Sequence, residues 1–238
     1  MAAPPPRDAG VHAPTDSARP DRRPSIVPPT RVVLPSPPEA GPASARTIGE
    51  RHPASPELSV TVESVITGED AEKLWDTYYV NFAPLGELAF LQHVFSRDEI
   101  IGELANPRIT KIVGWAGTEP VGMGMVTNDL ESVPQISPDF LRARYPDHAA
   151  RGGIYYGILV AVSPQQRGLT LFNRIYTELW QVAAKAGGIL AFDICQFNRE
   201  AFDTDALVER IASNFPDGRV AVADQQTWYI AELPNPID

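Results

Sequence analysis

The sequence predicts a mixed α/β (α+β) domain, with helices on both faces of a β-sheet, behind a disordered N-terminal tail. Three observations lead to this fold class. Residues 1–57 hold 14 of the 24 prolines and no Phe, Trp or Tyr, so they lack the apolar area that offsets the entropy of folding. From residue 58 onward, segments with strand and helix periodicity follow one another. A predicted β-hairpin interrupts their alternation, which argues against a purely parallel sheet.

The predicted domain boundary lies at residue 58. We expect residues 1–57 to be a Pro/Ala-rich tail with local polyproline II structure, and residues 58–238 to form one domain of ordinary size. Two apolar stretches of the tail, RRPSIVPP and TRVVLPSPP, have the form of short docking motifs in disordered chains. The tail is therefore either a plain linker or the site of a protein partner.

Local patterns predict the elements of the domain in order. LSVTVESVI alternates and is β-branched, as strands are. Ser96 and Glu99 form a capping box that begins a helix, and Asn106-Pro107 ends it. TKIVGWA and VGMGMVTN flank the turn residues GTEP, as the strands of a hairpin do. In full, we predict strands at 58–66, 110–116, 121–128, 154–162 and 189–197, helices at 68–82, 96–106, 169–186 and 199–215, a short helix and loop at 137–153, and a final strand or pair of strands at 219–233.

Charge and composition exclude several classes of function. The predicted domain has 13 basic and 24 acidic residues, a net charge of −11, whereas a nucleic-acid-binding protein needs a basic face. Cys195 is the only cysteine, which excludes a disulfide framework and argues against a cysteine-based zinc site, so we expect no metal. No apolar run reaches the roughly 18–20 residues of a membrane span, and the N-terminus lacks the apolar core of a signal peptide. We therefore expect a cytoplasmic protein with neither nucleic acid nor membrane as partner.

The stretch Val162-x-Pro164-x-x-Arg167-Gly168-x-Thr170 joins a predicted strand to a predicted helix. The first N–H groups of a helix have no partner within it, and the helix dipole adds partial positive charge there, so such a junction favours an anion. Gly168 would keep a side chain out of the space of that anion. Alternatively, it serves only the close packing of strand and helix.

This stretch resembles the acyl-CoA-binding signature of the GNAT superfamily of N-acyltransferases, Arg/Gln-x-x-Gly-x-Gly/Ala, with Gln165, Gly168 and Thr170 at its named positions. The element order over residues 58–233 is also similar to that superfamily. The resemblance implies a mostly antiparallel central sheet and acetyl-CoA or another acyl-CoA as co-substrate. It also implies that the loop amides bind the coenzyme pyrophosphate and that the thioester lies where the preceding strand parts from its neighbour. The coenzyme-binding residues that it implies are Val162, Gln165, Gln166, Arg167, Gly168, Leu169, Thr170 and, near the pantetheine arm, Asn198.

Asn198 begins a segment, Asn-Arg-Glu-Ala, that is similar to the Asn-x-x-Ala with which many superfamily members start their next helix. It is equally well explained as an N-cap residue. Two positions depart from the superfamily pattern. Thr170 replaces a Gly or Ala near the phosphates, and Asp205 and Ala206 stand where many members have a tyrosine that protonates the leaving thiolate. Another group must supply that proton.

Tyr155, Tyr156 and Asp193 are the candidate catalytic residues, since aminolysis of a thioester uses a base for the amine and a donor for the sulfur. Tyr155 and Tyr156 point to opposite faces of their strand, so one should line the cleft; each is otherwise a core aromatic. Asp193 lies within the apolar segment ILAFDICQF, where an unpaired carboxylate is costly, so it faces a polar cleft or has a structural partner. Cys195 is expected to be a structural thiol.

The leading hypothesis is an N-acyltransferase that transfers an acyl group, most often acetyl, to an amine of a small molecule or protein by direct attack in a ternary complex. The polar segment 127–138 and the aromatic segment 75–95 lie where acceptors approach in the superfamily; otherwise they are a surface turn and part of the core. Two other classes stay open: a degenerate acyl-CoA-binding domain without transfer activity, and a cargo or interaction protein addressed by its tail. The oligomeric state is not predicted.

Overall fold

The computed structural model describes residues 56–90, 93–166 and 169–233. All of them belong to a unit that spans Pro53–Asp238. The predicted tail, residues 1–57, lies almost wholly outside the described residues, so its boundary stays a prediction. No helix in the described part of the chain is long and apolar enough to cross a membrane.

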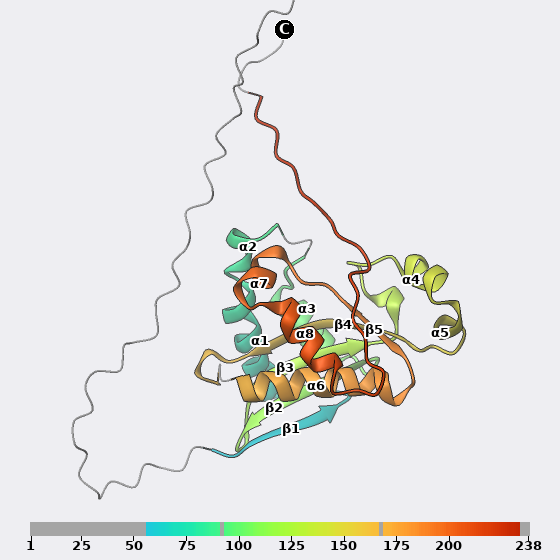
Figure 1. The fold of residues 1–238 in the computed structure, drawn as a ribbon. Helices are drawn as coiled ribbons and strands as arrows, with labels where there is room; N and C mark the ends of the chain where they lie inside the picture. Colours follow the sequence, from blue (N-terminus) through green and yellow to red (C-terminus); the bar gives the residue numbers. More distant parts are fainter. Residues whose placement is uncertain (1–55, 91–92, 167–168, 234–238) are drawn as a thin grey trace, which may run out of the picture. The chain divides into compact units, whose positions relative to one another are not determined.

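The described residues form a five-stranded sheet whose strands lie side by side in chain order (Figure 1). Neighbouring strands from β1 to β4 are antiparallel, and β4 and β5 are parallel. This arrangement confirms the predicted mixed, mostly antiparallel sheet. The strands are β1 (Leu58–Glu63), β2 (Ile109–Ala116), β3 (Glu119–Thr127), β4 (Ile154–Val162) and β5 (Ile189–Phe192).

Helices cover both faces of the sheet. Leu74 from one helix packs with Val113, whereas Ile175 from another packs with Ile112; consecutive residues of a strand point to opposite faces. Gly114 lets Ile175 approach closely, since a Cβ there would lie 2.8 Å from the Ile175 Cδ1. The helical elements are α1 (Gly68–Phe82), α2 (Leu85–Leu88), α3 (Arg97–Ala105), η1 (Leu130–Ser132), α4 (Pro138–Arg144), α5 (Pro146–Ala150), η2 (Pro164–Gln166), α6 (Leu169–Lys185), α7 (Gln196–Ala201) and α8 (Thr204–Ala212).

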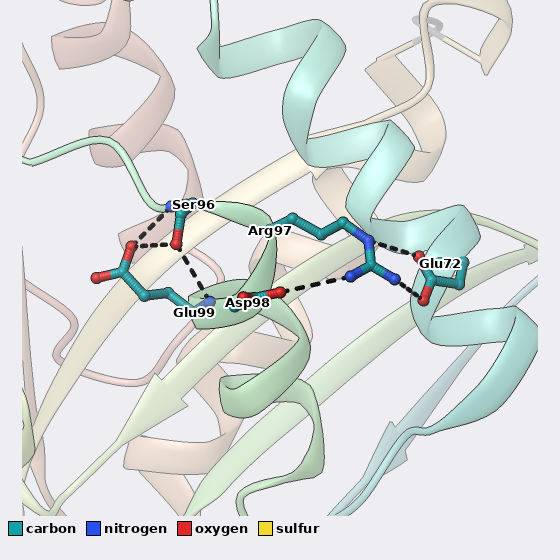
Figure 2. Close-up of polar contacts among 5 residues, drawn as sticks. All are labelled: Glu72, Ser96, Arg97, Asp98 and Glu99. Carbon is teal, nitrogen blue, oxygen red and sulfur yellow. Dashed lines mark hydrogen bonds and ion pairs between the residues drawn. The ribbon is translucent and has the colours of Figure 1, made fainter.

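The predicted capping box begins α3. The Ser96 N–H donates to Glu99 Oε2 at 2.7 Å, and the Ser96 side chain accepts from the Glu99 N–H, as Figure 2 shows. The next residue, Arg97, joins α3 to α1 through one edge of its guanidinium group: Nε donates to Glu72 Oε2 at 3.1 Å, and Nη2 donates to Oε1. The N-cap formed by Ser96 contributes about 1 kcal/mol to stability. Local sequence and one ion pair thus orient α3 against α1.

Lys111 of β2 is fully buried, with 0% of its surface exposed. Among the described residues it is the one charged side chain in the core. Its Nζ donates to the Ser64 carbonyl at 2.8 Å and to the Asn106 carbonyl. Burial lowers the pKa of the Lys111 ammonium to about 8, an effect that Glu103 partly offsets. Lys111 therefore fastens the end of β1 and the end of α3 to the sheet.

Two predicted elements after β4 are wrong in extent. The strand predicted at 189–197 ends at Phe192, and the helix predicted at 199–215 is two helices, α7 and α8. Asp203, between them, has a φ of 45°, in the left-handed region that an α-helix cannot continue through. Among the residues that the structure describes, no strand pairs with the apolar segment after Phe192, which enters α7 instead.

The predicted final strand or pair of strands at 219–233 is also wrong: this segment has no strand and is exposed. Its alternating pattern suits a strand, but a strand also needs a partner backbone. Asp217 has a φ of 56°, and a Cβ on Gly218 would lie 2.2 Å from the Ala212 carbonyl oxygen. A tight turn that requires glycine thus separates this segment from α8.

Candidate active site

The parallel strands β4 and β5 pair over only four residues, from Ile154 opposite Ile189 to Gly157 opposite Phe192. Strand β4 then continues to Val162 without β5 beside it. Main-chain groups on that side of residues 158–162 therefore have no β5 partner, and buried or partly buried backbone groups need one. The resemblance implies a thioester at the point where these two strands part, and this assignment stays a prediction.

A β-bulge lies at the same point. Val126 of β3 pairs with Gly157, and the next residue back, Met125, pairs with Leu159, so Ile158 is an extra residue in β4. A bulge reverses the alternation of side chains and bends its strand. As a result, Tyr156 and Leu159 share one face of the sheet.

The end of β4 leads through a short turn into α6. The Ser163 N–H donates to the Val121 carbonyl and the Gln166 N–H to the Ser163 carbonyl, both at 2.8 Å, and Ser163 Oγ donates to the side chain of Gln165. The first turn of α6 contains no acidic residue, and Thr170 is exposed. A helix start without acidic side chains fits a phosphate, because the first N–H groups of a helix have no partner within it. Arg167 and Gly168, at the centre of the predicted coenzyme loop, lie outside the described residues.

Asn81 is a residue that the sequence analysis missed. Its Nδ2 donates to the Thr77 carbonyl within α1 at 2.8 Å and to the Val162 carbonyl at 3.1 Å. This second bond ties the last turn of α1 to the end of β4, where the predicted coenzyme loop begins. The only sequence signal was a single amide side chain between aromatic residues in that turn, which does not identify its partner.

Tyr156 and Asp193, two of the predicted catalytic residues, are in contact. Tyr156 is 4% exposed, and its hydroxyl donates to Asp193 Oδ1. Burial raises the pKa of this hydroxyl, and the adjacent carboxylate raises it further. Asp193 itself is exposed and follows the last residue of β5, so the expectation that it lies inside an apolar strand is wrong. The pair stands where β4 and β5 part.

Tyr155 lies on the other face of β4, as the alternation predicts. It is partly buried against the cluster that α6 forms with the sheet, which includes Val162, Ile175 and Leu179. Its neighbours are therefore mostly aliphatic. Of the two tyrosines, the structure brings only Tyr156 to Asp193.

Asn198 lies in the middle of α7, and Cys195 is the N-cap residue of that helix, so the prediction that Asn198 starts a helix is wrong. Its carbonyl accepts from Thr204 Oγ1 and from the Phe202 N–H, each at 3.1 Å. Where a tyrosine is common in the superfamily, Asp205 forms an ion pair with Arg199 at 2.7 Å.

The polar segment after β3 has structural partners. Asp129 pairs with Arg108 at 3.0 Å, Glu131 pairs with Arg142, and Asn128 Nδ2 donates to the Gly152 carbonyl at 3.2 Å. These side chains hold the turns around η1 and α5. Their contacts favour the interpretation of segment 127–138 as surface turns.

The aromatic segment has a buried and an exposed part. Tyr78 stacks on Phe82, with ring centroids 4.5 Å apart, and its hydroxyl accepts from the Phe95 N–H at 2.9 Å; burial raises the Tyr78 pKa to about 12. Tyr79 and Phe90 are exposed. Tyr78 is therefore part of the core, whereas Tyr79 and Phe90 reach the surface.

No group of three or more His, Cys, Asp or Glu side chains in the described residues is placed to hold a metal ion. Comparison with protein-family models finds no match, and neither does a search of curated proteins. The chain is similar to several solved structures at low sequence identity.

Three of these structures illustrate that similarity. An aminoglycoside acetyltransferase from an uncultured soil metagenomic sample is 13% identical over 74% of this chain and 97% of its own, with a TM-score of 0.42. A ribosomal-protein-alanine N-acetyltransferase from Brucella melitensis biovar Abortus 2308 is 13% identical over 74% and 99%, with a TM-score of 0.41. An acetyltransferase of the GNAT family from Desulfovibrio desulfuricans is 13% identical over 65% of this chain and 83% of its own, with a TM-score of 0.41. A likeness at this level concerns the fold alone.

Proposed function

We propose that the domain is an acyl-CoA-dependent N-acyltransferase of the GNAT type, which transfers an acyl group, most often acetyl, to an amine of a small molecule or a protein. One observation carries this proposal. Strands β4 and β5 part after Gly157 and Phe192, the contact between Tyr156 and Asp193 lies at that point, and the free end of β4 leads to the start of α6. An anionic coenzyme with a reactive thioester fits this combination.

The residues assigned to the coenzyme are those of the predicted loop and helix start. The amides of Leu169 and Thr170 stand in the first turn of α6, where a helix has unpaired N–H groups and partial positive charge, and they would hold the pyrophosphate. Gln165 and Gln166 would line its approach. When bound, the coenzyme supplies the activated acyl group as a thioester.

The raised pKa of the Tyr156 hydroxyl argues against Tyr156 as the donor that protonates the leaving thiolate. A thiol of ordinary pKa, about 8.5, is a stronger acid than this phenol, so proton transfer from Tyr156 to the thiolate is uphill. We therefore assign Tyr156 to holding Asp193 by a hydrogen bond, and Asp193 to accepting a proton. Its exposed carboxylate is free to reach the amine.

The proposed step is direct attack. The amine nitrogen forms a bond to the thioester carbonyl carbon, the nitrogen loses a proton to Asp193, and the carbon–sulfur bond breaks with its electron pair on sulfur. The thiolate then takes up the proton that Asp193 received, because a carboxylic acid is a stronger acid than a thiol, and Asp193 becomes a carboxylate again. A cationic acceptor suits both the Asp193 carboxylate and the net charge of the domain, because opposite charges attract.

The test is binding followed by turnover in the full chain. Isothermal titration with acetyl-CoA should give saturable binding that Gly168→Val abolishes, since added bulk fills the phosphate space. Gly102→Val, a glycine of α3 with open space around its Cβ position, is the matched control and should bind normally. Release of free coenzyme A with a panel of amines should then show turnover.

The binding and turnover results separate the proposal from its alternatives. Absence of binding at millimolar acetyl-CoA, propionyl-CoA and coenzyme A would overturn the proposal. Normal binding by Gly168→Val would make Gly168 a packing residue. Binding without turnover on any amine would support the degenerate coenzyme-binding domain instead.

A further inference from the structure

A pocket lies between α6 and strand β1, at the edge of the sheet that is farther from Tyr156 and Asp193. The strand order β1-β2-β3-β4-β5 places β1 three strand spacings from β4, roughly 14 Å. The pocket has a volume of about 260 Å³, below the range of about 300–1,000 Å³ that is typical of drug-sized ligands. It is lined by Val60, Asn173, Arg174, Thr177 and Glu178. Its size and place suit a small ligand outside the proposed active site.

The polar residues of the pocket share one face of α6, because residues three and four positions apart lie together on a helix. The other faces of α6 are packed: Ile175 and Leu179 belong to the cluster on the sheet, and Tyr176 packs with α8. Asn173 and Thr177 lie on the remaining face and are nevertheless partly buried. A solvated helix face leaves such side chains exposed. This face of α6 is therefore sheltered by β1 rather than open to water.

Two groups in the pocket lack the partners that sheltered polar groups normally have. Within the part of the chain that the structure describes, the buried Oδ1 atom of Asn173 has no hydrogen-bond partner. Among the same residues, the partly buried Glu178 carboxylate has neither a hydrogen-bond nor an ion-pair partner. Withdrawing such groups from water without a partner is unfavourable. Both groups are acceptors, so the missing partner is a donor, and the carboxylate favours a cation.

Arg174 brings a positive charge to the same pocket without neutralising Glu178. Residues of opposite charge that are four positions apart on a helix commonly pair. Both residues are described by the structure, and no ion pair joins them; instead, Arg174 Nη1 donates to the Leu58 carbonyl of β1 at 2.7 Å. This bond holds the guanidinium group beside the strand and uses one of its five N–H donors. The pocket therefore presents a positive and a negative charge that are kept apart.

We propose that this pocket binds a free α-amino acid with an aliphatic side chain. The ammonium group of the ligand has three N–H donors, which meet Asn173 Oδ1, the Thr177 hydroxyl and the Glu178 carboxylate. The carboxylate of the ligand meets the Arg174 guanidinium group, whose planar shape suits it. The aliphatic side chain lies on Val60, the apolar residue of the lining. This site is independent of the proposed acyl transfer.

The test is titration of the full chain, without coenzyme, with L-leucine and two analogues that each lack one of its charged groups. Amide chemical shifts should show saturable binding of L-leucine at millimolar concentration, with the largest changes at residues 173–178. Isoamylamine lacks the carboxylate, and isocaproate lacks the ammonium group. Each analogue should bind about tenfold more weakly or worse, because it leaves one charge of the pocket without a partner.

Three variants test the place of binding. Glu178→Gln keeps the shape of the side chain but removes its charge, and should weaken L-leucine binding by about tenfold or more. Glu209→Gln, at an exposed position of α8, is the matched control and should bind as the wild type does. Asp193→Asn should also bind L-leucine normally, because that carboxylate lies at the proposed active site. Circular dichroism verifies that each variant is folded.

Several results would overturn the proposal. Absence of saturable L-leucine binding would mean that the pocket does not take this ligand. Equal binding of either analogue would mean that the site does not require both charges. Unchanged affinity in Glu178→Gln would place the ligand outside the pocket, and a loss of affinity in Asp193→Asn would place it at the proposed active site. Acetyl-CoA binding is measured separately, so a failure of this proposal is distinguishable from a failure of the proposed function.

Discussion

The two sides of the sheet are held together in different ways. On the antiparallel side, every residue of β1 pairs with β2, and buried clusters cover both faces of β2 and β3. On the parallel side, β5 pairs over four residues that are all only partly buried, and β4 continues alone. A ligand or another chain can use main-chain groups only where the sheet leaves them unpaired. We therefore expect the antiparallel side to be the more rigid and the parallel side to hold the proposed binding site.

The largest effect expected concerns packing. Ile112→Ala, at a position with no exposed surface between the sheet and α6, should lower the free energy of unfolding by about 2–5 kcal/mol. Ile189→Ala, at the partly buried edge strand β5, should lower it by roughly 1 kcal/mol. Urea denaturation of the two variants measures both values. Equal losses would contradict the contrast between the two sides.

The lowered pKa of Lys111 predicts that the free energy of unfolding depends on pH. Its pKa is about 8 in the folded state, below the ordinary 10.5, so the unfolded chain binds more protons between these pH values and stability should rise with pH across that range. The full rise is roughly 3 kcal/mol. Urea denaturation at pH 7.5, 9 and 10.5 measures it. Lys111→Met should lack this rise, and an equal rise in that variant would assign it to other groups.

The parallel side should carry the chemistry. Asp193→Asn should lower kcat by roughly 10²-fold, the scale for the loss of a proton-transfer group, with little change in acetyl-CoA affinity. Tyr156→Phe should lower kcat less, because the carboxylate remains but loses its hydrogen bond. Tyr155→Phe should stay within about twofold of the wild type, since Tyr155 packs against the α6 cluster. Coenzyme A release measures all three, and a large loss in Tyr155→Phe alone would reverse the assignment.

The smallest effect concerns the hydrogen bond that links the end of α1 to the end of β4. Asn81→Ala removes the bond to the Val162 carbonyl and should weaken acetyl-CoA binding by several-fold, equivalent to about 1 kcal/mol. Asn128→Ala removes a comparable side chain to backbone bond away from the loop and serves as the matched control. Titration calorimetry gives the affinities, and thermal unfolding shows whether the two variants lose similar stability. Equal affinities would show that Asn81 has no part in positioning the loop.

Local sequence by itself determined the elements with strong local signals. The helix predicted at 68–82 and the strand at 154–162 have the observed bounds, and the Ser96 capping box forms as predicted, because periodicity and capping depend on residues within a few positions of one another. The hairpin of β2 and β3 follows for the same reason. The order of these elements along the chain was sufficient to predict the mixed sheet.

Tertiary structure decided the rest. Whether residues 193–197 and 219–233 are strands depended on neighbouring backbone that their own side chains do not specify, and in both places that neighbour is missing from the described chain. The contact of Tyr156 with Asp193 and the bond from Asn81 to Val162 join residues 37 and 81 positions apart. Side-chain periodicity indicates which face a residue occupies, but only the pairing of β4 with β5 and the packing of α1 determine what it meets there.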